Sequence, residues 1–166
     1  FIIIMLKENI IISYLRAKFN DLSVIEKKLI QRSKDALKDA YAPYSGFLVG
    51  SSVLLSDGKI ISANNQENVA FPSGLCAERV VLFNAGANYP NLEIDIIAVS
   101  AKSNLYKITD IISPCGACRQ VMAEYQEKQN KKIKILLHLN NDEVLIFSSV
   151  DDLLPLLFTN PNLKKF

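Results

Sequence analysis

The order of helical and strand patterns is the feature that most limits what this chain of 166 residues can fold into. Apolar residues recur at helical spacing in some segments and fill short, strand-length runs in others. The predicted elements are a helix over 23–41, strands over 47–56 and 59–62, a helix over 76–87, a strand over 94–101, a helix over 113–129, strands over 133–139 and 144–147, and a short helix over 149–152. This alternation predicts one α/β domain, in which helices cover the faces of a mixed sheet.

Local signals set several of these boundaries. Ser23 opens a capping box, which is typical of the first turn of a helix. Asp57-Gly58 lies between two strand patterns and predicts a hairpin. Ser113 and Pro114 predict a helix with the serine as its N-cap and the proline at its first position.

Composition and charge exclude several classes of protein. The chain is 49% hydrophobic and 22% charged, which is ordinary for a globular domain and unlike a disordered one. Its 19 basic and 17 acidic residues leave a net charge of +2, too little to indicate a nucleic-acid or membrane-surface partner. The apolar runs are too short to span a bilayer. Three cysteines do not suit a secreted disulfide framework, so we expect a cytoplasmic protein.

The N-terminal segment lacks the order of a secretory signal, which places basic residues before the apolar stretch. Phe1 is not an initiating residue. We therefore expect either that translation starts at Met5 or that an upstream stretch has been read through.

All three cysteines lie at predicted helix starts, in the motifs Cys76-Ala77-Glu78-Arg79 and Pro114-Cys115-Gly116-Ala117-Cys118-Arg119. Helix N-termini favour negative charge and lower the pKa of a thiol there. Three thiolates suit a tetrahedral zinc ion with one position left open. An open position is typical of a catalytic site, because water can bind there and be activated.

Glu78 follows the first cysteine by two residues, an offset that lets its carboxylate point past the metal instead of binding it. It can then take a proton from water and return it to a substrate nitrogen, as in zinc deaminases. Three thiolates and Zn²⁺ sum to one negative charge, which makes hydroxide harder to form. We hypothesise that Arg79 and Arg119 offset this charge by donating hydrogen bonds to the sulfur atoms.

Three other interpretations of the cysteines stay open. A structural zinc knuckle needs a fourth ligand, and His138, in an apolar strand pattern, is the one histidine of the chain. A redox Cys-x-x-Cys pair is the second interpretation, although no thioredoxin-like pattern surrounds it. Three buried cysteines without a role are the third.

The chain resembles the small homo-oligomeric cytidine deaminases from about Lys34 to its C-terminus. The resemblance rests on Cys-Ala-Glu-Arg at 76–79, Ser-Pro-Cys-Gly-x-Cys-Arg-Gln at 113–120, Ala-Tyr-x-Pro-Tyr-Ser-x-Phe-x-Val-Gly at 40–50 and Asn-x-Glu-Asn at 65–68. It implies a three-layer α/β/α fold around a five-stranded sheet, one zinc per subunit and a homotetramer. It also divides the chain into an N-terminal extension, 1–22, and a deaminase domain, 23–166.

Residue roles follow from the same resemblance, position by position. It implies that Cys76, Cys115 and Cys118 bind zinc and that Glu78 moves protons. The implied substrate contacts are Phe47 against the base, Asn65 and Glu67 on the ribose hydroxyls, the backbone at Ala77 on the amide edge of the base, Phe71 where the family often has a tyrosine, and Phe158 reaching the site of a neighbouring subunit.

The expected function is zinc-dependent hydrolytic deamination of cytidine and deoxycytidine to uridine and deoxyuridine, with release of ammonia, in pyrimidine salvage. One alternative is the deamination of another aminopyrimidine nucleoside, such as a blasticidin-type antibiotic. Deamination of tRNA or DNA is a further alternative, but it needs a basic groove that the net charge does not indicate. A non-catalytic zinc-binding interaction module is also open, although a structural site has no use for Glu78.

Overall fold

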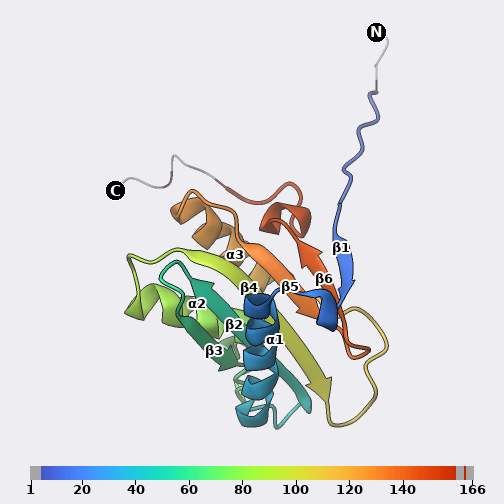
Figure 1. Ribbon diagram of the computed structural model, residues 1–166, viewed down its shortest axis with the longest axis vertical. Helices are drawn as coiled ribbons and strands as arrows, with labels where there is room; N and C mark the ends of the chain where they lie inside the picture. The colour runs from blue at the N-terminus through green and yellow to red at the C-terminus, as the bar shows by residue number, and fades with distance from the viewer. Residues whose placement is uncertain (1–4, 160–162, 164–166) are drawn as a thin grey trace.

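The computed structural model describes residues 5–159 and 163, and its centre is one six-stranded sheet (Figure 1). The strand order is β1-β6-β5-β4-β2-β3, in which β4 and β5 are parallel and the other neighbours are antiparallel. The elements are β1 (Leu15–Lys18), α1 (Val24–Ala36), β2 (Phe47–Leu55), β3 (Ile60–Asn64), α2 (Ala77–Asn88), β4 (Ile94–Ser103), α3 (Gly116–Lys128), β5 (Lys134–His138) and β6 (Glu143–Phe147), with short 3-10 turns between some of them.

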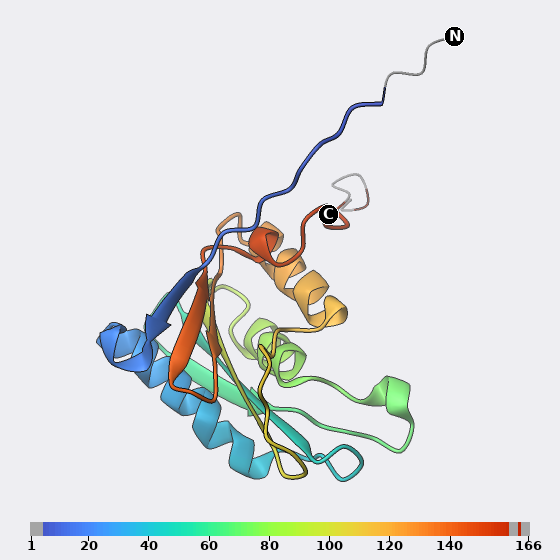
Figure 2. The same cartoon turned by 90° about the vertical axis from the view of Figure 1, so that its right-hand side faces the viewer.

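Three layers make up the fold, because α1 covers one face of the sheet while α2 and α3 cover the other (Figure 2). The core under α2 and α3 is the larger of two apolar clusters, and the smaller one lies under α1. The predicted α/β architecture and the order of its elements are confirmed. The expected last helix is a short 3-10 turn, Val150–Asp152.

The implied five-stranded sheet is wrong, because β1 adds a sixth strand at the edge. β1 pairs antiparallel with β6, and its Arg16 forms an ion pair with Glu143 at 2.6 Å. The ring of Tyr14, just before the strand, packs 5.3 Å from the ring of Phe147, centroid to centroid. The four residues of β1 belong to the segment 1–22, for which the sequence predicted no structure.

The capping box at Ser23 is confirmed, and it also attaches α1 to the sheet. The Ser23 hydroxyl accepts from the backbone N–H of Glu26, and the Glu26 carboxylate accepts from the backbone N–H of Ser23. The other carboxylate oxygen of Glu26 accepts from Nζ of Lys134 on β5. One side chain therefore caps the helix and pairs with the strand beneath it.

The predicted start of α3 at Ser113-Pro114 is wrong by two residues. The N-cap is Cys115, whose backbone is extended, and the helix begins at Gly116. Arg119 accounts for the difference, since its guanidinium donates to the Pro114 carbonyl and to the Ser113 hydroxyl. Segment 113–115 is thereby held as a loop against the first turn.

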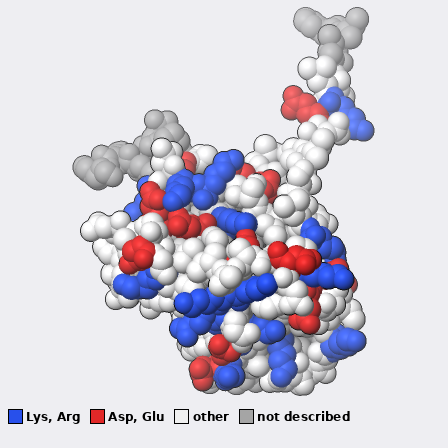
Figure 3. All heavy atoms as spheres, in the orientation of Figure 1, with Lys and Arg blue, Asp and Glu red and all other residues white. Residues whose placement is uncertain are grey.

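The surface carries both signs of charge. In the view of Figure 3, basic side chains gather over α1 and acidic ones lie among and around them. Within residues 5–159 and 163, none of the helices combines the length and the apolar character that crossing a bilayer requires.

Gly50 on β2 lets α1 approach the sheet closely, and we predict that Gly50→Ala destabilises the protein. A Cβ atom there would lie 2.0 Å from the backbone oxygen of Ser33, so the helix would have to move. We expect the free energy of unfolding in urea to fall by about 2 kcal/mol. Gly116→Ala is the control, because nothing lies within 4 Å of its added methyl group. Equal stability of the two variants would contradict this account.

The environment of Glu26 also predicts that the stability of the fold depends on pH. Burial favours its neutral form, but hydrogen bonds from Lys134 and Ser23 outweigh this and lower the pKa of Glu26 below its ordinary 4.5. Such a carboxyl stabilises the fold above its ordinary pKa, and the contribution is lost as the pH falls through the folded-state value. Glu26→Gln should therefore lower the free energy of unfolding by about 1 kcal/mol at pH 7 and by much less at pH 3.

Urea unfolding at both pH values checks this expectation. Glu8→Gln, in the exposed segment before β1, should change little at either pH and serves as the control. A loss for Glu26→Gln that is the same at pH 3 and pH 7 would show that the carboxylate charge plays no part.

Candidate active site

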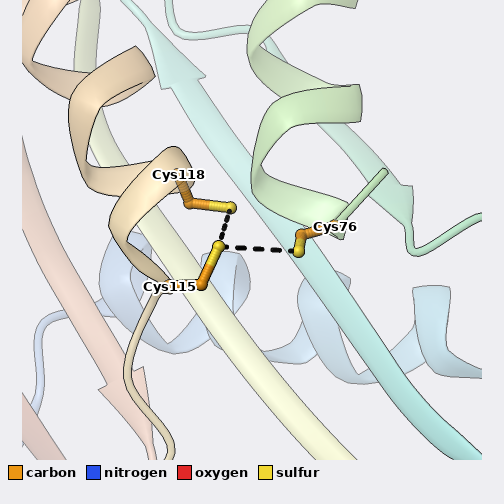
Figure 4. A group of neighbouring side chains, drawn as sticks. All are labelled: Cys76, Cys115 and Cys118. Atoms are coloured by element: carbon orange, nitrogen blue, oxygen red, sulfur yellow. Dashed lines mark hydrogen bonds between the residues drawn. The ribbon is translucent and has the colours of Figure 1, made fainter. Parts of the chain in front are cut away.

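The three cysteines, far apart in the sequence, form one cluster in space (Figure 4). Their sulfur atoms lie within 4.8 Å of one another, and all three are free thiols. The Sγ–Sγ distance is 3.9 Å from Cys76 to Cys115 and 3.5 Å from Cys115 to Cys118. In the part of the chain that the structure describes, the three cysteines are the ligating side chains that lie close enough together to hold a metal ion.

Two helix starts bring the cluster together. Cys76 is the N-cap of α2 and Cys115 is the N-cap of α3, while Cys118 lies in the first turn of α3. The two helices pack closely where Tyr125 meets Gly86, because a Cβ at this glycine would lie 2.2 Å from the tyrosine hydroxyl oxygen. Because the N-caps Cys76 and Cys115 both belong to the cluster, both helix N-termini, with their unpaired N–H groups, lie around the sulfur atoms.

The cluster favours a thiolate at Cys76. A hydrogen bond from the Cys118 thiol and the nearby Arg79 guanidinium lower the pKa of Cys76 to about 5, although burial acts in the opposite direction. Arg79 Nη2 lies 4.0 Å from Cys76 Sγ. The same contact with Cys76, together with burial, raises the pKa of Cys118. Without a cation, the three sulfur atoms therefore do not all ionise at this spacing. A bound cation would stabilise all three as thiolates, and a set of three soft sulfur ligands fits zinc.

His138 does not complete the cluster. It lies on β5, where Nε2 is 3.7 Å from Asp142 Oδ1, and the ligand group of the described residues contains the cysteines without it. The interpretation of a structural knuckle completed by His138 is therefore wrong.

Glu78 is a buried acid beside the cysteines, with 4% of its surface exposed. Its Oε2 atom is buried and has no hydrogen-bond partner among the described residues. Burial, together with the charge at Cys76, raises the pKa of Glu78 to about 7. A carboxyl group that titrates near neutral pH can both accept and donate a proton, which suits general acid–base chemistry.

A cavity of about 310 Å³ opens onto Glu78 and two of the cysteines, within the size range of small-molecule sites. Four of the implied substrate contacts, Phe47, Asn65, Glu67 and Phe71, line the same cavity. The cavity has further lining residues to which the sequence motifs assigned no role, and these are Ser45, Val49, Gln66, Gly74, Leu75, Val99, Ile112 and Ser113. Of these, Ser45, Val49, Gln66 and Ser113 lie inside the quoted motifs, which is the signal that could have found them.

Asn65 also supports the wall of the cavity. Its Oδ1 accepts from the backbone N–H of Val49 at 2.8 Å, and its Nδ2 donates to the carbonyl of Phe47 at 2.9 Å. An amide has two acceptor lone pairs and two N–H groups, so one of each stays available to a ligand.

Glu67 braces the loop before β2 in the same way. Its Oε2 accepts from the backbone N–H groups of Tyr44 at 2.9 Å and Ser45 at 3.3 Å. Desolvation opposes the charged form, but these bonds and one from the Ser45 hydroxyl outweigh it and lower the pKa of Glu67. The side chain is therefore a carboxylate at neutral pH.

Arg119 does not take the position that the sequence hypothesis gave it. Its guanidinium donates to the carbonyls of Pro114 and Leu153, each at 2.7 Å, and to the hydroxyl of Ser113. It therefore joins the loop before α3 to the C-terminal turn instead of meeting sulfur. Arg79 is the arginine that lies at a thiol.

The other predicted residues lie around the site at different depths. Ala77 is fully buried at the first position of α2. Phe71 is 73% exposed at the cavity and packs edge-to-face on Tyr44, with centroids 5.6 Å apart. Phe158 is exposed and does not line this cavity, and its carbonyl accepts from Gln120. The prediction places Phe158 at the site of a neighbouring subunit, so it stays a prediction.

Known proteins share this combination of sequence and fold. The family model described as the cytidine and deoxycytidylate deaminase zinc-binding region matches residues 24–133. A cytidine deaminase of Halalkalibacterium halodurans is 37% identical over 131 residues, which cover 79% of this chain and 92% of the relative. The chain belongs to the cytidine deaminase family.

Further relatives and solved structures of the family agree with this assignment. A cytidine deaminase of Sporosarcina psychrophila is 40% identical over 99 residues, 60% of this chain and 68% of that one. The crystal structure of cytidine deaminase from Burkholderia pseudomallei has a TM-score of 0.66 at 37% identity and covers 80% of this chain and 98% of its own. That from Mycobacterium tuberculosis has a TM-score of 0.63 at 28% identity, with coverages of 83% and 100%. The α/β fold is therefore that of the cytidine deaminase family.

The cysteine cluster predicts which side chains are required for zinc binding. We expect Cys115→Ser to lose most of the bound zinc, because it removes a sulfur from the centre of the cluster and hard hydroxyl oxygen is a poor substitute. Cys115 is exposed, so the fold does not depend on burying its side chain. His138→Gln should keep the zinc content of the parent protein. Metal analysis of purified protein checks both, and loss of zinc in the histidine variant would contradict the three-cysteine site.

Proposed function

We propose that this member of the cytidine deaminase family catalyses the zinc-dependent hydrolytic deamination of cytidine and deoxycytidine. The products would be uridine or deoxyuridine and ammonia, and the reaction would serve pyrimidine salvage. The observation that carries the proposal is the buried carboxyl group of Glu78, whose unpartnered oxygen lies beside the three-cysteine cluster, two members of which line the same cavity as Glu78. A structural metal site or an interaction module has no use for such a group.

Cys76, Cys115 and Cys118 would hold one zinc ion per chain. When bound, zinc would supply a Lewis acid that lowers the pKa of a water molecule and so makes it a better nucleophile. Arg79, at 4.0 Å from Cys76 Sγ, reduces the negative charge that the three sulfur atoms bring to the site.

Glu78 would move the protons of the reaction. Its carboxylate takes a proton from the attacking water, whose oxygen bonds to C4 of the pyrimidine. The proton goes to N3. The proton of the hydroxyl group now on C4 then passes through Glu78 to the amino group, so that C4 becomes a carbonyl as the C4–N bond breaks and ammonia leaves. Because the pKa of Glu78 is about 7, the group is suited to both accepting and donating near neutral pH.

The cavity wall would hold the nucleoside in place. Phe47 supplies an aromatic surface for the flat base, and the backbone at Ala77 would meet the amide edge of that base. Asn65 and Glu67 keep free hydrogen-bonding capacity and would bind the ribose hydroxyls. Phe71 would contact substrate at the cavity mouth, where it has no hydroxyl to offer.

Assembly and location complete the proposal. We infer a homotetramer in which Phe158 reaches the site of a neighbouring subunit, and a deaminase domain over 23–166 after an extension over 1–22. Three free cysteines suit the reducing conditions of the cytoplasm, where we place the protein. The partners would be small nucleosides, without nucleic acid or membrane.

The test is the fall in ultraviolet absorbance when purified protein meets cytidine or deoxycytidine, with zinc measured on the same sample. We expect turnover with about one zinc per chain. Glu78→Gln should keep that zinc and lower kcat by about a thousandfold, because the amide cannot carry a proton between water and amine.

Glu93→Gln is the matched control, since Glu93 pairs with Lys131 away from the cavity, and it should keep full turnover. Full zinc in the parent protein without turnover on either nucleoside would overturn the substrate assignment. An aminopyrimidine antibiotic of the blasticidin type would then be the next substrate to assay. Undiminished turnover in Glu78→Gln would refute the role of Glu78.

A further inference from the structure

One hydroxyl group connects the two parts of the cavity wall that the proposed function assigns to sugar and base. Ser45 Oγ donates to Oε1 of Glu67 and accepts from the backbone N–H of Phe47 at 3.0 Å. Ser45 itself lines the cavity. A serine hydroxyl has a single proton to donate, so its orientation is set by the carboxylate.

The bond from Ser45 restricts the free acceptor position of Glu67. A carboxylate offers about four acceptor positions. The backbone N–H groups of Tyr44 and Ser45 occupy Oε2, and the Ser45 hydroxyl occupies one position on Oε1. One position on Oε1 is left, on the atom that Ser45 holds. Without the hydroxyl, only the two backbone N–H groups on Oε2 would hold the carboxylate, and Oε1 could shift about the last torsion of the side chain, which is broad in energy.

Phe47 is held from both sides of its backbone. Its N–H donates to Ser45 Oγ, and its carbonyl accepts from Asn65 Nδ2. Asn65 in turn accepts from the N–H of Val49 further along β2. The contacts form one connected series from Glu67 through Ser45 and Phe47 to Asn65, so the three side chains assigned to substrate share one support.

We propose that Ser45 is a positioning residue for nucleoside binding, which acts through Glu67 to select ligands that carry ribose hydroxyls. The inference rests on the proposed function, since it assigns Glu67 to the sugar. Ser45 places Oε1 for the hydroxyl and takes no part in proton transfer. Its removal should therefore weaken binding of ligands with ribose hydroxyls and leave the chemical step nearly unchanged.

The experiment compares Ser45→Ala with the parent protein in steady-state kinetics. We expect KM for cytidine to rise about tenfold, the size of effect that one hydrogen bond to a charged group produces, and kcat to change less than twofold. Uridine and 2′,3′-dideoxyuridine are then used as competitive inhibitors. The inhibition constant of uridine should rise about tenfold, whereas that of the dideoxy compound should rise less than twofold.

Two further variants separate positioning from general support of the fold. Ser45→Thr keeps the hydroxyl and should restore KM and the uridine inhibition constant to within about twofold of the parent. Ser51→Ala removes a buried hydroxyl from the same strand as Phe47, one that donates to the Ala98 carbonyl at 3.0 Å and does not line the cavity. It should leave the ratio of the two inhibition constants unchanged, even where it lowers stability.

The possible outcomes separate a failure of the role proposed for Ser45 from a failure of the proposed function. Equal weakening of both inhibitors by Ser45→Ala, or no weakening of either, would overturn the role of Ser45 while leaving the deaminase activity in place. A large fall in kcat without a change in KM would also overturn it. A parent protein that neither turns over cytidine nor binds uridine would instead overturn the proposed function.

Discussion

The meeting of two helix N-termini is the constraint on which the rest of the site depends. Cys76 and Cys115 are the N-caps of α2 and α3, and neither side chain caps its helix with a hydrogen bond. The unpaired N–H groups and the positive ends of both helix dipoles therefore surround the sulfur atoms and favour negative charge there. The sheet face that both helices share, and the close contact of Tyr125 with Gly86, keep the two N-termini in place.

The same arrangement accounts for a buried acid with an unpartnered oxygen. Burying Glu78 without a partner for Oε2 disfavours its charged form and opposes folding near neutral pH. A core selected for stability alone would not keep this residue. Its position in the first turn of α2, two residues from Cys76, places it beside the cysteine cluster, where we propose that it moves protons. The cost in stability thus lies at the proposed reaction centre, which is common in enzymes.

The side chains assigned to the sugar also hold the cavity together. Asn65 and Glu67 bind the backbone of β2 and of the loop before it, and each keeps some hydrogen-bonding capacity for a ligand. Because each of these side chains both supports the backbone and can bind a ligand, the cavity wall is already formed before a ligand binds. Preorganised polar groups of this kind lose little conformational freedom when a ligand binds.

The sequence by itself determined the element order, the Ser23 capping box, the offset of Glu78 from Cys76 and the spacing of Cys115 and Cys118, because periodicity, capping and motif spacing depend on residues a few positions apart. Only the tertiary structure decided the sixth strand, the meeting of Cys76 with Cys115 and the contact of Arg119 with Leu153. Arg16 and Glu143 are 127 positions apart, and Arg119 reaches Leu153 across 34 positions. Such contacts form only when packing brings distant segments together, so no local pattern in the chain could specify them.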